Sequence, residues 1–186
     1  GPFCTMMFAD MGAEIIKIEQ AGTGDDTRQM GPFKNGESAY FMNLNRNKKG
    51  VTLNLKNPKG KAIFIDLVKK ADVVIENFRP GTMEKLGLGY EELKKVNPAI
   101  VYAAISGFGH TGRYSQRPGY DIISQAMSGL MSTTGWPGGE PTRTGTAMGD
   151  VLGGLSCAIG ILAAVFNKIQ TGEGQKVDVA LVDSAV

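Results

Sequence analysis

Short apolar runs alternate with helix-like segments along most of this chain. The run Ala99-Ile-Val-Tyr-Ala-Ala-Ile105 is apolar throughout, and the runs at 72–75 and 175–180 are rich in valine. Strands of this kind are buried on both faces, which is typical of a parallel sheet covered by helices. The order of segments therefore predicts an open α/β fold.

Periodicity and turn residues place the expected elements. The expected strands are 14–19, 51–55, 72–75, 99–105 and 175–180. The expected helices are 2–11, 58–70, a short one after 81, 90–96, 121–130 and 150–169. The stretches 21–49 and 131–149 have little periodicity, so we expect two long loops. Loops of that length inside compact domains are usually functional or disordered.

Composition excludes several classes of protein. A formal net charge of only +2 argues against nucleic-acid binding. The longest apolar run, 157–166, is shorter than the about 20 residues that a bilayer requires, so no membrane association is expected. Cys4 and Cys157 match no metal or redox spacing and are expected to be buried, reduced thiols, which favours a cytoplasmic protein.

Both ends of the chain are expected to be cut. The sequence opens on Gly1-Pro2-Phe3 without a methionine, and it stops at 184–186 in the first turn of an expected helix. We therefore expect a fragment of a longer protein.

Several stretches resemble one known family in their order and spacing. They are 9–19, 24–28, 45–49, Glu76-Asn-Phe-Arg-Pro-Gly81, Pro118-Gly-Tyr-Asp121, Gly149-Asp150 and 171–175. Together they are similar to the family III CoA-transferases (the CaiB/BaiF family) and the related acyl-CoA racemases. The resemblance implies that residues 1–186 form the N-terminal part of a Rossmann-like large domain, an open parallel sheet with flanking helices. The family's first strand and its C-terminal half would be absent, and an intertwined homodimer is expected.

Asp150 follows a Gly-rich loop at the expected start of the long helix. From the residues alone the ordinary interpretation is an N-cap, because Asp is a favoured capping residue. The resemblance instead identifies Asp150 with the family's catalytic aspartate, which implies transfer of CoA between an acyl-CoA and a free carboxylic acid through a covalent aspartyl intermediate. Gly149 would leave room for a bulky thioester, and backbone N–H groups at the helix start could stabilise negative charge.

Tyr120 and Asp121 are expected to support this site. The racemase branch has a histidine at the position of Tyr120, where it acts as one of two bases. The only histidine of this chain, His110, lies in a different loop and is expected to be solvated, with a smaller chance of lining the pocket. Asp121 is either the cap of its own helix or an acidic residue near the site.

Coenzyme A carries phosphates, so its site needs cations and backbone donors. The candidates are Lys17, Arg28, Arg46, Lys48, Lys49, Lys56 and Arg79, most of which we expect to be ordinary surface charges. By resemblance, Asn77 and Phe78 line the CoA groove, and Leu53 and Lys56 lie near the adenine. Arg79 is placed to reach a phosphate. Gln20 stands where some relatives use arginine, which puts one phosphate contact in doubt. Lys85 also replaces an arginine of some relatives and keeps the charge but not the planar fork.

Three rival functions remain. An acyl-CoA racemase or epimerase is disfavoured by Tyr120, and a non-catalytic CoA-binding protein is disfavoured by Asp150. Gly107-Phe-Gly-His-Thr-Gly112 spells the dinucleotide-binding fingerprint, but Pro118 and the lack of an apolar period after it indicate that no helix follows. Acyl-CoA and a carboxylic acid are thus the expected small-molecule partners. No metal and no tightly bound cofactor are implied, because coenzyme A is a substrate.

Overall fold

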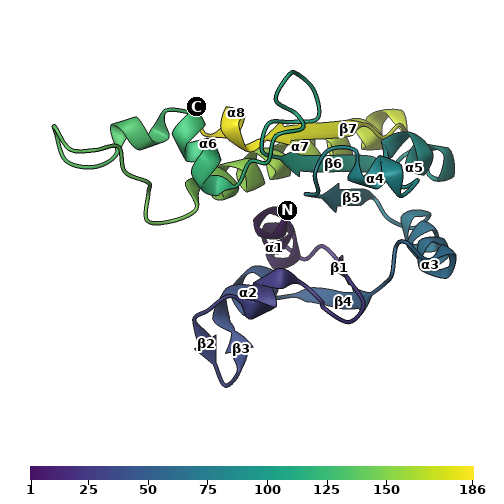
Figure 1. The fold of residues 1–186 in the computed structure, drawn as a ribbon. Helices are drawn as coiled ribbons and strands as arrows, with labels where there is room; N and C mark the ends of the chain where they lie inside the picture. Colours follow the sequence, from purple (N-terminus) through teal and green to yellow (C-terminus); the bar gives the residue numbers. More distant parts are fainter. The chain divides into compact units, whose positions relative to one another are not determined.

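The computed structural model describes residues 1–186, which divide into two compact units (Figure 1). One unit comprises Pro2–Lys70, and the other comprises Gly1 together with Ala71–Val186. Parallel strands and covering helices occur in both, so the predicted α/β class is confirmed.

The unit Pro2–Lys70 is built on a two-stranded parallel sheet of β1 and β4. A small antiparallel pair, β2 and β3, lies in the connection between these strands. The elements are α1 (Pro2–Asp10), β1 (Ile15–Glu19), η1 (Asp26–Gln29), β2 (Phe33–Lys34), β3 (Glu37–Ser38), α2 (Ala39–Asn45), β4 (Lys48–Thr52) and α3 (Pro58–Val68).

The expectation of a loop over 21–49 was wrong. This stretch contains η1, the β2–β3 pair and α2. Ser38 caps α2, because its Oγ accepts the backbone N–H of Phe41 at 3.0 Å. The following strand also begins earlier than predicted, since pairing with β1 extends from Lys48 to Thr52. Pairing with a neighbouring strand, which alternation along the sequence does not reveal, sets these bounds.

The larger unit contains a parallel sheet in the order β5-β6-β7. Its elements are β5 (Val73–Glu76), α4 (Thr82–Lys85), α5 (Tyr90–Val96), β6 (Val101–Ser106), α6 (Asp121–Met127), η2 (Leu130–Thr133), α7 (Met148–Thr171), β7 (Lys176–Ala180) and α8 (Leu181–Ser184). All residues of the central strand β6 are buried, as its continuous apolar run predicts.

The long helix α7 packs closely against the sheet and α8. A Cβ on Gly153 would lie 2.5 Å from Leu181, and one on Gly160 would lie 2.7 Å from Val177, so glycine allows the close approach. The opposite side of α7 carries an apolar stripe, which is exposed in this structure and consists of Leu155, Ile159, Leu162, Phe166 and Ile169.

This helix is longer than the apolar run from which it was predicted. It begins at Met148 and is long and apolar enough, by length and composition alone, to cross a membrane. The expectation that no segment is long enough was therefore wrong. The core helices of soluble proteins meet the same criterion, and α7 buries one side, including Cys157, Ile161 and Ala164.

The loop after β6 confirms that the apparent dinucleotide fingerprint does not open a helix. Residues 107–119 form bends and turns, and the next helix begins only at Asp121. Gly107, the first glycine of this stretch, instead allows a close contact between two backbone segments. A Cβ on Gly107 would lie 2.4 Å from the Cα of Gly119, so the two ends of the loop cross backbone against backbone.

Candidate functional site

The first turn of α7 lies at the carboxyl edge of the larger unit's sheet. Strand β7 leads directly into α8, and a Cβ on Gly153 would touch Leu181 of α8 and Ile105 near the end of β6. Open α/β sheets bind ligands beyond the carboxyl ends of their strands. Asp150 is therefore at the edge of the sheet where a ligand is expected.

Asp150 is the third residue of α7 and does not act as its cap. The cap position is Ala147, which makes no side-chain capping bond. The Asp150 side chain is exposed and accepts no hydrogen bond from another group of the protein. The surrounding protein nevertheless raises the pKa of its carboxyl group by partial burial, and the negative charge of Asp121 raises this pKa further.

Asp121 caps α7 and not its own helix. Its Oδ1 accepts the backbone N–H groups of Gly149 at 2.8 Å and of Asp150 at 3.2 Å. This places Asp121, Gly149 and Asp150 together, as predicted for a supporting acidic residue. A Cβ on Gly149 would lie 1.9 Å from Ser124 Oγ, so only glycine lets α6 approach α7 this closely.

The N–H groups at the start of α7 are already in use. Besides the two bonds to Asp121, the N–H of Met148 donates to the carbonyl of Thr146, and that of Val151 donates to the carbonyl of Ala147. The expectation that free N–H groups of this turn stabilise negative charge in the reaction was therefore wrong.

Gln125 is a site residue that sequence reasoning missed. It is fully buried, and its Nε2 donates to Asp121 Oδ2 at 2.7 Å. Its Oε1 accepts the backbone N–H of Thr144 at 2.9 Å. Gln125 therefore ties Asp121 to the loop that leads into α7. Its position one helical turn after Asp121 was the available signal.

Tyr120 is the N-cap residue of α6 and is 76% exposed. It directly precedes Asp121, so it belongs to the same end of the sheet as Asp150. No imidazole occupies this position, in agreement with the sequence.

His110 is not a solvated loop residue, and that expectation was wrong. Its side chain is only 7% exposed, with Nε2 lying 3.6 Å from Glu76 Oε1 and Nδ1 lying 3.1 Å from Lys176 Nζ. Burial, followed by the positive charge of Lys176, lowers the pKa of His110. Sequence reasoning failed here because residues from β5 and β7 enclose this loop position.

The predicted CoA-groove residues of the larger unit follow β5 directly. Asn77, Phe78 and Arg79 are exposed at the carboxyl end of this strand. Lys85 is exposed at the end of α4, one helix further along. The strand thus delivers three of the four predicted residues to the same edge as Asp150.

Leu53 and Lys56 belong to the unit Pro2–Lys70 and follow β4. Leu53 is half-buried and Lys56 is exposed. The turn that holds them packs tightly under α3, because a Cβ on Gly60 would lie 2.2 Å from the carbonyl oxygen of Asn54.

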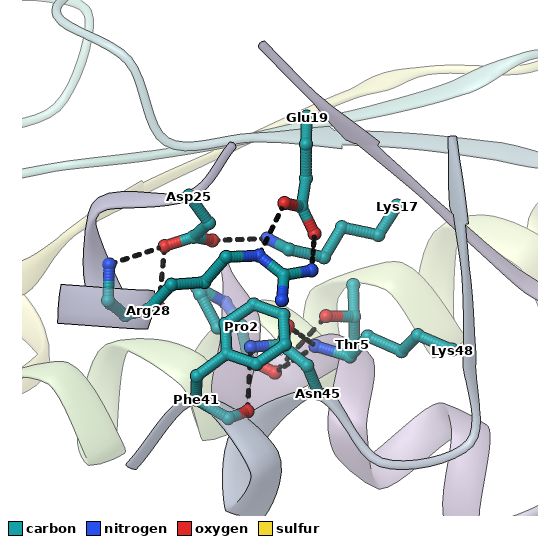
Figure 2. Close-up of polar contacts among 10 residues, drawn as sticks. Pro2, Thr5, Lys17, Glu19, Asp25, Arg28, Phe41, Asn45 and Lys48 are labelled. Atoms are coloured by element: carbon teal, nitrogen blue, oxygen red, sulfur yellow. Dashed lines mark hydrogen bonds and ion pairs between the residues drawn. The ribbon is translucent and has the colours of Figure 1, made fainter. Parts of the chain in front are cut away.

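The seven candidate phosphate-binding cations differ in whether they already contact other groups of the protein. Figure 2 shows three of them. Lys17 forms an ion pair with Asp25, and Arg28 donates two hydrogen bonds to Glu19. Lys48 donates hydrogen bonds to the carbonyl of Pro2 and to Asn45 Oδ1. Arg46 and Lys49 pair with Asp10 and Glu14. Lys56, which the resemblance places near the adenine, and Arg79, which directly follows the predicted groove residues, form no ion pair and are exposed.

Two loop aromatics differ in their surroundings. Tyr114 packs within its own loop, between Arg113 and Arg117 and against the edge of Phe108. Trp136 is 89% exposed and lies in the loop before α7.

Comparisons with known proteins agree on one family. The family model of CoA-transferase family III matches residues 1–186. An acetyl-CoA:oxalate CoA-transferase of Acetobacter aceti is 49% identical over 100% of this chain and 48% of its own length. A succinyl-CoA:glutarate CoA-transferase of Mus musculus is 48% identical over 100% of this chain and 43% of its own length.

Solved structures show the same fold. The crystal structure of a CaiB/BaiF family protein from Brucella suis superposes with a TM-score of 0.94 at 43% identity, covering 99% of this chain and 50% of that one. The chain thus spans about half the length of the relatives that it matches.

Proposed function

Because this chain belongs to the CoA-transferase family III, we propose that the protein moves CoA from an acyl-CoA thioester to a free carboxylic acid through Asp150. The observation that carries the proposal is the state of this carboxylate. It is exposed at the carboxyl edge of the sheet, accepts no hydrogen bond, and has a raised pKa. A carboxylate without hydrogen bonds keeps its lone pairs available for attack.

The proposed reaction is a series of acyl-transfer steps through two covalent intermediates on Asp150. An Asp150 oxygen attacks the thioester carbonyl and the C–S bond breaks. This step releases the CoA thiolate and forms a mixed anhydride between Asp150 and the acyl group. The thiolate then attacks the Asp150 carbonyl carbon, which releases the donor acid and forms an aspartyl-CoA thioester. The acceptor carboxylate repeats these two steps in reverse, so that a new acyl-CoA leaves and the Asp150 carboxylate is restored.

The residues around Asp150 divide the remaining tasks. Asp121 would hold the main chain at Gly149 and Asp150, to which it is hydrogen-bonded, and the exposed Tyr120 would contact the substrate. In the larger unit, coenzyme A would contact Asn77, Phe78, Arg79 and Lys85. For Leu53 and Lys56, in the unit Pro2–Lys70, a contact with coenzyme A is proposed from the family resemblance alone. Lys56 and Arg79 are unpaired cations, as phosphate binding requires. No further cofactor is needed, because CoA is itself a substrate.

We extend the proposal to assembly and location. Residues 1–186 would form the N-terminal part of the family's large domain in a cytoplasmic protein. The apolar stripe of α7 would be covered in an intertwined homodimer, since so many exposed apolar side chains on one helix favour a buried contact.

A trapping experiment tests the nucleophile. The full-length protein would be incubated with a panel of acyl-CoAs, treated with hydroxylamine or borohydride, and analysed by mass spectrometry. We expect a hydroxamate or a reduced product on Asp150 that is lost in Asp150→Ala. Continued CoA exchange with an unmodified Asp150 would refute the assignment.

Exchange of the α-proton with solvent deuterium distinguishes a transferase from a racemase, whose histidine is replaced by Tyr120 in this chain. A racemase exchanges the proton at the α-carbon with solvent and needs bases on both sides of it. We expect no solvent deuterium at this carbon during turnover. Deuterium incorporation without CoA exchange would favour the racemase, and CoA binding with neither reaction would favour a non-catalytic CoA-binding protein.

A further inference from the structure

A chain of buried polar side chains lies beneath the segment Asn77–Arg79. Glu76 is the last residue of β5, and its side chain is only 4% exposed. Its Oε2 accepts the backbone N–H of Phe78 at 2.7 Å, and its Oε1 accepts the hydroxyl of Tyr102 at 3.3 Å. The carboxylate therefore closes a tight turn at the point where the chain leaves the sheet.

His110 faces the same carboxylate from the loop after β6. Its Nδ1 lies 3.1 Å from Lys176 Nζ, and a protonated lysine can only donate, so Nδ1 is the acceptor. The proton of a neutral imidazole is then on Nε2. This atom is buried, has no hydrogen-bond partner within normal distance, and lies 3.6 Å from Glu76 Oε1.

A second residue of β7 holds the main chain of His110. The Asp178 carboxylate accepts the backbone N–H of His110 at 2.9 Å, so both the main chain and the ring of His110 are held. Lys176, His110 and Glu76 thus lie in succession from β7 to the end of β5, with a hydrogen bond between Lys176 and His110 and a close approach of 3.6 Å between His110 Nε2 and Glu76 Oε1. The series ends at the N–H of Phe78.

We propose that Glu76 and His110 are positioning residues for the CoA nucleotide. Glu76 holds the turn that presents Asn77, Phe78 and Arg79, and the buried ring of His110 packs against the Glu76 carboxylate and limits the positions that this carboxylate can take. A hydrogen bond from a backbone N–H to a buried carboxylate is stronger than one between neutral groups, so it restrains this exposed turn effectively. The inference rests on the proposed function, in which these three residues contact CoA.

The alternative is a polar cluster that serves only folding. A cluster of that kind would change the melting temperature on substitution without changing the affinity of the folded protein for CoA. A positioning role instead separates the Michaelis constant from the turnover number, because the turn contacts the nucleotide and Asp150 performs the chemistry.

The experiment compares four variants of the full-length protein by steady-state kinetics and by calorimetric titration with CoA. For Glu76→Ala we expect the KM for acyl-CoA and the Kd for CoA to rise about tenfold, with kcat within about twofold. Glu76→Gln keeps one acceptor for Phe78 and should recover part of the loss. His110→Ala should raise the KM for acyl-CoA and the Kd for CoA by about as much as Glu76→Gln does. The matched control Glu92→Gln, a surface change in α5, should have no effect.

Two further variants, Arg79→Ala and Asn77→Ala, distinguish the positioning role from the CoA site on which it rests. If Arg79→Ala weakens CoA binding while folded Glu76→Gln and His110→Ala bind normally, the positioning role is wrong and the CoA site stands. If Arg79→Ala and Asn77→Ala both bind CoA normally, the proposed site itself is wrong. A lower kcat at unchanged KM in the Glu76 or His110 variants would also overturn the inference.

Discussion

The Asp121 carboxylate accepts the backbone N–H of Asp150 at 3.2 Å, so one acidic residue holds the main chain of the other. The same contact brings two negative charges together at the start of α7. This proximity raises the pKa of Asp150 beyond the effect of burial. Substitutions at Asp121 should therefore change the pH dependence of any chemistry that uses Asp150.

Asp121→Asn should move the acid limb of kcat/KM to lower pH. A nucleophilic carboxylate must be ionised, so activity falls as the pH drops through the raised pKa of Asp150. Asparagine keeps an oxygen for the two N–H groups and removes the negative charge, which lowers that pKa toward 3.8, its ordinary value. Rate measurements between pH 4 and 8 would detect the shift of the acid limb to lower pH. An unchanged limb, or the same shift in the surface control Asp66→Asn, would contradict this explanation.

Gly149→Ala should destabilise the protein by about 1–3 kcal/mol, because the new methyl group overlaps Ser124 Oγ. Adding Ser124→Ala should recover part of the loss, since it removes the overlapping oxygen. Gly145→Ala is the control, as nothing lies within 4 Å of its Cβ position. Urea unfolding would measure all three. Equal stability of Gly149→Ala and Gly145→Ala would show that the close approach of α6 and α7 is not needed.

Arg79→Ala should raise the KM for acyl-CoA by about tenfold, because it removes an unpaired cation from the proposed phosphate contact. Arg79→Lys should have a smaller effect, since charge is kept and the planar fork is lost. Lys49→Ala is the matched control, because Lys49 already pairs with Glu14 on the surface. Equal KM values for Arg79→Ala and Lys49→Ala would remove Arg79 from the site.

Lys48 should make stability depend on pH in the alkaline range. Partial burial, followed by the positive charge of Lys17, lowers the pKa of Lys48 to about 8. Between this value and 10.5, the unfolded chain binds a proton that the folded protein does not, so stability rises with pH. Relative to Lys48→Met, the wild type should gain on the order of 1 kcal/mol from pH 7 to 10, after discounting for solvent screening. Parallel denaturation curves would test this, and a constant difference between the two proteins would exclude the lowered pKa.

The sheet of the larger unit could be predicted because its strands are nearly continuous apolar runs. β5, β6 and β7 lie within one or two residues of their expected bounds. The proximity of Asp121 and Asp150 also followed from the family resemblance. The role of Asp121 as the cap of α7 did not, because a cap supplied by another helix leaves no local pattern in the sequence.

The sequence predictions that were wrong share a physical cause. His110 occupies a polar, Gly-rich loop, and its ring is buried against Glu76 and Lys176, which are distant in sequence. Helix α2 lies in a stretch rich in glycine and asparagine, where the Ser38 cap and the neighbouring elements outweigh local composition. Long-range contacts decide such positions, and a single sequence does not display them.

The crossing of Gly107 and Gly119 makes the residues between them an Ω-loop, closed at its neck by main chain alone. Substitutions or added residues near its tip, around Gly112, would leave the neck intact and would not displace Tyr120 or Asp121. The tip of this loop can therefore change in evolution, or be engineered, while its neck and the start of α6 keep their geometry.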